Sequence, residues 1–220
     1  MSRYFEKIFP VLKNLSECVI LYFIEYPKER KIPMKIVLAS ASPRRQELLK
    51  YIVPDFDIIP ADIDETIPDG IPADSSAEYL AVKKAEHISA QHPDSLVIGS
   101  DTVVIIDGEV LGKPEDKSDA ERMLRKLSGQ VHTVVTGVCL SMNGRSKSFS
   151  KATKVKFYPL SDKEILDYIA TEEPMDKAGA YGIQGFGSVL IEGIEGDFFN
   201  VMGLPVSSLK RKMGEFYKLT

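Results

Sequence analysis

The sequence has few cysteines and no excess of positive charge, and both shortages exclude classes of protein. Only Cys18 and Cys139 occur among the 220 residues, and they form neither a metal-binding nor a disulfide pattern. We therefore expect a cytoplasmic protein in a reducing compartment, with Cys139 as a small core residue. The formal net charge is −4, so no overall positive field exists to hold a nucleic acid, whereas a small anionic substrate needs only local positive charge.

The sequence also lacks an apolar run in its N-terminal part that could cross a membrane. Val19–Ile24 is a run of six residues between Glu17 and Glu25, far shorter than a bilayer requires. The run resembles a weak signal-peptide core, but no small-residue cleavage site follows it. We therefore expect no membrane partner.

Apolar runs alternate with amphipathic segments, and there is no repeat or low-complexity tract, which favours an α/β fold. Asp107-Gly108 and Asn143-Gly144 are hairpin signals. Hairpins beside helical crossovers indicate a mixed sheet. The expected strands are Ile36–Ala39, Leu96–Ile98, Val103–Ile106, Glu109–Leu111, Val131–Met142 and a final strand that reaches Phe157.

Three helices are expected to begin at capping boxes, in which a Ser is followed three residues later by a Glu. The pairs are Ser75 with Glu78, Ser118 with Glu121, and Ser161 with Glu164. Apolar residues follow at helical spacing and are expected to be core. They are Ala77, Leu80, Ala81, Ala85 and Ile88 in the first helix, Ala120, Met123, Leu124 and Leu127 in the second, and Ile165, Leu166 and Ile169 in the third.

The segment 35–45 carries the strongest functional signal. An apolar strand ends in Ser40 and Ser42, and Pro43 then opens an amphipathic helix. The helix start exposes backbone N–H groups, and the guanidinium groups of Arg44 and Arg45 would add positive charge. This predicts an anion cradle suited to phosphates. An ordinary strand–helix turn with two solvated arginines is the alternative.

Two acidic regions of the sequence are candidates for chemistry. Asp101 interrupts an apolar run, where an ionised carboxylate is costly unless a cation or a water-filled site compensates it. An Asp in a bulge or loop is the alternative. Asp62, Asp64 and Glu65 form an acidic loop whose oxygen ligands suit Mg²⁺ or Mn²⁺, although a solvated loop would look the same.

Basic and glycine-rich positions complete the candidates. Lys84 lies beside the apolar stripe of its helix while Lys83 should point outward, and Lys113 stands between a Gly and a Pro. Taken alone, a helix lysine is more often solvated. The loop Gly179–Gly187 lacks Walker spacing, but the amide of Gln184 matches the donor–acceptor edge of thymine or uracil. A plain turn-rich loop is the alternative.

In order and spacing, these segments resemble the Maf family of nucleotide pyrophosphatases from about Met34 to about Leu209. The motifs that carry the resemblance are Ser40–Arg45 with Glu47–Leu49, Gly99–Val104, Leu111–Pro114, Leu127–Gly129 with His132, Asp176–Gly185 and Asn200–Pro205. The resemblance implies a bent mixed β-sheet flanked by helices, with two lobes around a deep cleft, as in Maf/ITPase-like proteins. It also implies one domain over 34–220. Residues 1–33 would then be an extension outside the family, or an accessory helix.

The resemblance assigns roles to these positions, in a reaction that cuts a nucleoside triphosphate into monophosphate and pyrophosphate. Asp101 and Glu65 would hold Mg²⁺ or Mn²⁺ and act in catalysis with Lys84 and Lys113. Ser40, Ser42 and Arg45 would bind phosphates. The remaining three positions, Arg44, Thr102 and Gln184, resemble the dTTP/UTP branch and would select the base. Asp62 and Asp64 are assigned no role.

The family further implies a homodimer. A 7-methyl-GTP pyrophosphatase of the same family is one alternative function. A septum-formation regulator without enzymatic activity is the other.

Overall fold

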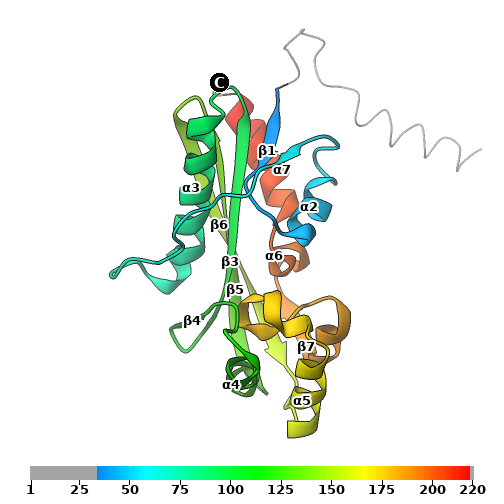
Figure 1. Ribbon diagram of the computed structural model, residues 1–220. Coiled ribbons are helices and arrows are strands. Elements are labelled where there is room, and N and C mark those ends of the chain that lie inside the picture. The colour runs from blue at the N-terminus through cyan, green and yellow to red at the C-terminus, as the bar shows by residue number, and fades with distance from the viewer. Residues whose placement is uncertain (1–33, 219–220) are drawn as a thin grey trace, which may run out of the picture. The chain divides into compact units, whose positions relative to one another are not determined.

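The computed structural model describes residues 34–218, drawn in colour in Figure 1. The expected extension 1–33 and Cys18 lie outside the described residues. Within the described part, no helix combines the length and apolar character that a membrane crossing requires.

A seven-stranded mixed sheet forms the centre of this part of the chain, as the sequence predicts. Its order is β2-β1-β3-β5-β6-β7, and β4 also pairs with β3. The pairs β1–β2 and β1–β3 are parallel, and the others are antiparallel. The strands are β1 Ile36–Leu38, β2 Asp57–Ile58, β3 Leu96–Ile106, β4 Glu109–Leu111, β5 Val131–Met142, β6 Arg145–Phe157 and β7 Ile191–Glu195.

Helices lie on both sides of the long strands (Figure 1). The α-helices are α2 Pro43–Leu49, α3 Ala73–Gln91, α4 Lys117–Leu127, α5 Asp162–Ala170, α6 Phe198–Met202 and α7 Val206–Tyr217. Three short 3₁₀ turns join α5 to β7. They are η1 Glu173–Asp176, η2 Ala178–Ala180 and η3 Gly185–Leu190.

The period of two along β1 and β3 assigns neighbouring residues to opposite faces of the sheet. Val37 and Val97 pack with the α3 residues Ala81 and Ala85. Leu38 belongs instead to the cluster that includes side chains of α2 and α7. Both faces of these strands are therefore covered, which explains their nearly continuous apolar sequence.

The long strands contribute side chains to two separate hydrophobic clusters, which define two lobes. The first half of β3 contributes Leu96 and Ile98 to a cluster with α2 and α7. The second half contributes Val104 and Ile106 to a cluster with α4 and α5. The two-lobed mixed sheet implied by the resemblance is thus confirmed.

Helix α3 approaches the sheet so closely that only glycine fits at two strand positions. A Cβ on Gly99 would overlap the backbone carbonyl of Ala81, and a Cβ on Gly137 would overlap that of Ala77. Gly99 on β3 pairs with Cys139 on β5, and Gly137 on β5 pairs with Asp101 on β3, so the two glycines lie close together in the sheet. The close packing fixes the distance between α3 and β3.

Replacing Gly137 by alanine should therefore destabilise the protein. Because the obstructing atoms are backbone, α3 must shift, and we expect unfolding free energy to fall by about 2 kcal/mol, as in other overpacked interiors. Urea unfolding measures this. Gly193→Ala on β7 is the matched control, because a Cβ there meets nothing within 4 Å. Equal stability of the two variants would contradict the close packing.

The structure corrects two of the three predicted helix starts. Helix α3 begins at Ala73, with Pro72 at the N-cap position and no side-chain cap, because the helical bonding already starts there: Ser75 N donates to Pro72 O at 3.0 Å. Helix α4 is capped by Asp116, which accepts a hydrogen bond from Asp119 N; Asp caps as well as Ser. The capping box at Ser161 and Glu164 is confirmed.

Two further expectations need correction. Leu166 is 51 % exposed, and Tyr168 takes the expected buried position on α5 because it lies on the same helical face as Ile165. The two predicted strands around 99–102 are one continuous strand, β3, so the bulge or loop considered for Asp101 is wrong. The other apolar stripes are buried as predicted.

Candidate active site

A cavity of about 780 Å³ opens where one edge of β3 has no neighbouring strand within the described sheet. On one side, β3 pairs with β5 from Val97 to Ile105. On the other side it pairs with β1 only as far as Ile98 and with β4 only from Val104 onward. The intervening segment 99–103 of the described sheet is an open edge. Residues from both lobes line the cavity around it, including all ten positions to which the family resemblance assigns a role.

Asp101, at the middle of this open edge, forms the most buried charged contact of the site. Its Oδ1 atom accepts a hydrogen bond from Lys84 Nζ at 2.7 Å. Glu65 Oε1 lies 2.9 Å from the same Nζ, so one ammonium bridges two carboxylates. The Asp101 and Lys84 side chains are 12 % and 9 % exposed, whereas that of Glu65 is 55 % exposed. Two acids and one base therefore meet at a single point of the cavity wall.

The neighbouring lysine holds the loop that carries Glu65. Lys83 Nζ donates a hydrogen bond to the backbone oxygen of Asp64 at 2.7 Å, while the Asp64 carboxylate accepts from Thr66 N at 2.9 Å. The hydrogen bond from Thr66 lowers the pKa of Asp64. Lys83 points away from Asp101, as predicted, yet it fixes the residue next to Glu65.

Arg45 crosslinks three separate segments on the other face of β3. Its Nε donates to Gly203 O at 3.0 Å, Nη1 to Ser40 Oγ at 3.2 Å, and Nη2 to Thr102 Oγ1 at 3.0 Å. Burial lowers the pKa of Arg45, and the charge of Asp101 opposes that shift. A guanidinium has five N–H donors, so three are used within the protein and two remain. Arg45 is thus an anchor of the site with capacity for one further anion contact.

Thr102 belongs to a chain of buried polar groups. Its hydroxyl lies 2.9 Å from that of Thr136, which donates to Asn200 O at 2.8 Å. Because the Thr136 proton goes to Asn200, the Thr102 proton goes to Thr136, and Thr102 accepts from Arg45. The hydroxyl proton of Thr102 is therefore already committed to a bond within the protein. Asp101 and Thr102 point to opposite faces of β3, as strand geometry requires.

Ser40 and Ser42 shape the turn into α2. The hydroxyl of Ser40 accepts from Ser42 N at 3.3 Å as well as from Arg45. Ser42 is the N-cap of α2, its hydroxyl accepting from Arg45 N, and Pro43 is the first helical residue. The predicted strand–turn–helix arrangement is confirmed.

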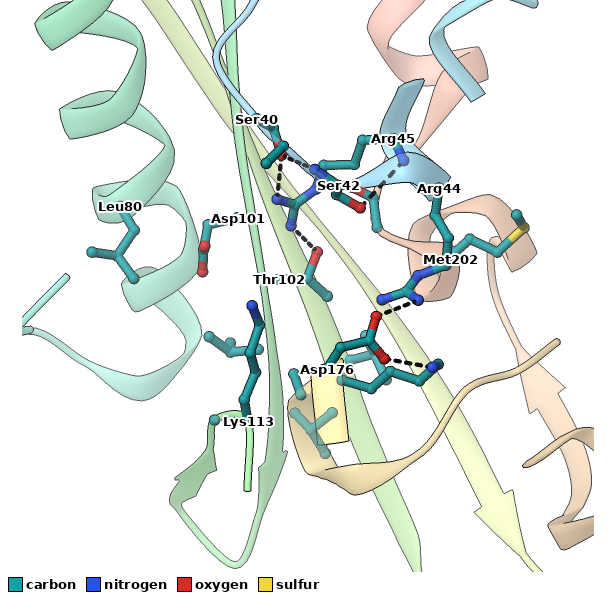
Figure 2. Close-up of a pocket in the computed structure, with 18 of the residues that line it drawn as sticks. Ser40, Ser42, Arg44, Arg45, Leu80, Asp101, Thr102, Lys113, Asp176 and Met202 are labelled. Carbon is teal, nitrogen blue, oxygen red and sulfur yellow. Dashed lines mark hydrogen bonds and ion pairs between the residues drawn. The ribbon is translucent and has the colours of Figure 1, made fainter. Parts of the chain in front are cut away.

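Arg44 reaches across the cavity to the second lobe. Its Nη1 lies 3.3 Å from Asp176 Oδ2 (Figure 2), and the carboxylate also contacts Lys177. Asp176 lies within the recognised glycine-rich segment, but its residue type gave no sign that it pairs with an arginine 132 positions away. The sequence analysis likewise gave no role to Thr136, or to Asn200 at the start of its motif, although both belong to the hydrogen-bonded chain of Thr102.

Lys113 and Gln184 are uncommitted within residues 34–218. Figure 2 shows Lys113 extending into the cavity from the loop that follows β4, on the side of Asp101. Both residues are exposed and line the cavity. An ammonium and a primary amide are thus available to a ligand, without loss of contacts to the described part of the protein.

The wall of the second lobe includes Tyr181, which is held by His132. The Tyr181 hydroxyl lies 2.7 Å from His132 Nε2, and both rings pack edge-on against Phe157. Burial lowers the pKa of His132 to about 4, so its imidazole is neutral at physiological pH. His132 therefore supports the wall and carries no charge to the ligand.

The donor set fits a divalent cation bound together with a ligand. The described residues contain no group of three or more His, Cys, Asp or Glu side chains placed to hold a metal. Glu65 and Asp101 nevertheless converge on a single cation, Lys84 Nζ. One or two carboxylates, completed by phosphate oxygens and water, are the usual protein contribution to a Mg²⁺ site.

The chain is similar to known proteins in family profile, in sequence and in structure. The profile of the family described as "Maf-like protein" matches residues 35–216. A dTTP/UTP pyrophosphatase of Carboxydothermus hydrogenoformans is 51 % identical over 185 residues, which cover 83 % of this chain and 99 % of that protein. A dTTP/UTP pyrophosphatase of Bacillus velezensis is 47 % identical over 182 residues, 83 % of this chain and 96 % of the relative. The solved structure of the Staphylococcus aureus Ham1 protein is similar with a TM-score of 0.46 and 21 % identity, covering 71 % of this chain and 79 % of that one.

Proposed function

The chain belongs to the Maf family, and we propose that it hydrolyses dTTP and UTP to the nucleoside monophosphate and pyrophosphate. The names of its relatives support this reaction and this pair of substrates. The low cysteine content supports a place in the cytoplasm. A homodimer stays a prediction of the family resemblance.

The observation that carries the proposal is the contact of Lys84 with both Glu65 and Asp101 in the cavity wall. A regulator that only bound a partner would have no need for a buried acid at an open strand edge. A hydrolase needs this acid, because a water molecule must lose its proton as it attacks phosphorus. Asp101 is the general base in the proposed reaction.

The cationic groups of the cavity bind the triphosphate. Lys84 and Lys113 hold phosphate oxygens and offset the charge that develops on the departing pyrophosphate. Arg45 orients the turn containing Ser40 and contributes its two remaining N–H donors. For the innermost phosphoanhydride bond to break, the α-phosphorus must lie nearest to Asp101, where water attacks.

Mg²⁺ or Mn²⁺ would be held by Glu65 and Asp101. When bound, such a cation neutralises phosphate charge and lowers the pKa of a water ligand. Asp101 and Glu65 supply the oxygen atoms that such an ion prefers. Lys84 keeps the two carboxylates together.

Arg44, from α2, and Gln184, from the glycine-rich loop, select the base. The amide of Gln184 offers a donor and an acceptor to the matching edge of thymine or uracil. Thr102 contributes through Arg45, since its own proton is committed to Thr136. Three branch-specific positions and the named relatives together favour dTTP and UTP over 7-methyl-GTP.

A nucleotide panel tests the function. Purified protein with Mg²⁺ or Mn²⁺ should release pyrophosphate from dTTP and UTP, with little orthophosphate. Faster hydrolysis of 7-methyl-GTP would move the protein to the other branch. Complete absence of hydrolysis would favour the non-enzymatic alternative.

A further inference from the structure

The turn η1 has a glutamate at its start that holds the glycine-rich loop in place. Glu173 Oε2 accepts from Phe186 N at 2.9 Å, and Oε1 accepts from Gly187 N at 3.1 Å. The Tyr168 hydroxyl donates to Oε1 at 3.0 Å and accepts from Gly182 N at 3.1 Å. Glu173 and Tyr168 therefore fix the loop on both sides of Gln184.

The loop has no room for side chains around this contact. Gly185 has a φ of +68°, and a Cβ there would collide with the Glu173 carboxylate. A Cβ on Gly187 would overlap Gly182 O and lie 2.6 Å from the Tyr168 hydroxyl. Glycine at 185 is thus required by the position of Glu173, and glycine at 187 by the positions of Gly182 and Tyr168.

The last residue of the same turn holds the other base-selecting side chain. Asp176 contacts Arg44, whose side chain is 32 % exposed. Lys177 connects the two ends of η1, because its Nζ donates to Glu173 O and to Asp176 Oδ1, each at 2.6 Å. Partial burial raises the pKa of Asp176, but Lys177 and Arg44 outweigh this and hold it below the usual value. Asp176 is therefore ionised at neutral pH and holds Arg44 by charge.

We propose that η1 is the specificity scaffold of this site: Glu173 positions Gln184 through the glycine-rich loop, and Asp176 positions Arg44 across the cavity. The inference rests on the proposed function, since it concerns how the base is selected. Both acids are positioning residues that act through their partners. An arginine side chain that is held before the substrate arrives loses less conformational entropy on binding.

The test compares Asp176→Asn and Glu173→Gln with wild type on UTP, CTP and GTP. Asparagine removes the charge that holds Arg44, and glutamine presents an N–H₂ group to at least one of the donors now bound by Glu173. In each variant we expect the preference for UTP, as a ratio of kcat/KM values, to fall roughly tenfold. The loss should appear in KM for UTP, while kcat stays within about threefold.

The matched controls make the same chemical changes outside the cavity. Asp167 on α5 pairs with Lys163, and Glu195 on β7 pairs with Lys154, and both are well exposed. Asp167→Asn and Glu195→Gln should keep the wild-type preference. An equal loss of preference in the controls would contradict a specific role for η1.

A double-mutant cycle separates positioning from general support of the fold. In an Arg44→Ala background, Asp176→Asn should reduce the preference no further, and in a Gln184→Ala background the same should hold for Glu173→Gln. Effects that persist in full in these backgrounds would overturn the proposal. If Glu173→Gln does not fold, Tyr168→Phe, which removes the hydroxyl shared by Glu173 and Gly182, takes its place.

The proposed function and this inference fail in different ways. Wild-type protein that releases no pyrophosphate from any nucleotide would refute the function. Active wild-type protein whose preference is unchanged by both η1 substitutions would refute the scaffold and leave the function in place.

Discussion

Asp101→Asn is expected to reduce kcat for dTTP and UTP about a thousandfold, within the range for loss of a general base. Asparagine has the same shape and can still accept the hydrogen bond from Lys84 Nζ, but it cannot take a proton from water. It also removes one of the two negative charges that suit a divalent cation. Steady-state pyrophosphate release measures the effect, and thermal unfolding should show a folded protein.

Asp107→Asn is the control for this substitution. Asp107 lies in the exposed turn at the end of the same strand, with a φ of +52° that asparagine also accepts. We expect its kcat to match that of wild type. Turnover of Asp101→Asn close to the wild-type rate would remove Asp101 from the reaction.

Lys84→Met should have the second largest effect, on both activity and stability. Methionine keeps a long apolar side chain but leaves the nearly buried Asp101 facing Glu65 without a cation. Removing one partner of a buried ion pair costs about 3 kcal/mol, and we expect a similar loss of unfolding free energy in urea. The phosphate also loses a cation, so kcat/KM should fall about a hundredfold.

The adjacent lysine provides the matched control. Lys83 contacts a backbone oxygen beside Glu65 and does not touch Asp101. Lys83→Met should therefore reduce kcat/KM by less than about tenfold, through loosening of the loop, and leave unfolding free energy nearly unchanged. Similar losses in the two variants would show that Lys84 acts as a surface charge only.

Local patterns were sufficient to predict much of the fold. The helical period placed Lys84 on the buried face and Lys83 outside, and the two hairpin turns were correct because Asp-Gly and Asn-Gly favour positive φ. Two capping boxes failed because the helices begin just upstream of them, α4 after Asp116, which caps as well as serine, and α3 after Pro72.

Long-range contacts were beyond the reach of sequence patterns. Arg45 was predicted to bind phosphate, but three of its donors bind protein atoms, one of them on Gly203, 158 positions away. The pairing of Arg44 with Asp176 depends in the same way on how the two lobes meet. The open edge of β3 arises because β1 and β4 pair with different ends of the same strand. No local sequence pattern predicts that gap.

The gap explains how one strand brings both Asp101, the proposed general base, and Thr102, which binds Arg45, to the same cavity. Strand alternation directs Asp101 toward α3 and its neighbour Thr102 toward Arg45. Because no strand pairs with the other edge of 99–103 within the described sheet, one cavity is in contact with both residues. A second strand along this edge would close the site.

Hydrolysis in ¹⁸O-labelled water tests most directly whether this cavity directs water to the innermost phosphorus. With dTTP as substrate, mass spectrometry of the products should find the label in the monophosphate and none in pyrophosphate, and Asp101→Asn should suppress its incorporation. Label in pyrophosphate would mean attack at the β-phosphorus, and would contradict the position of the triphosphate relative to Asp101.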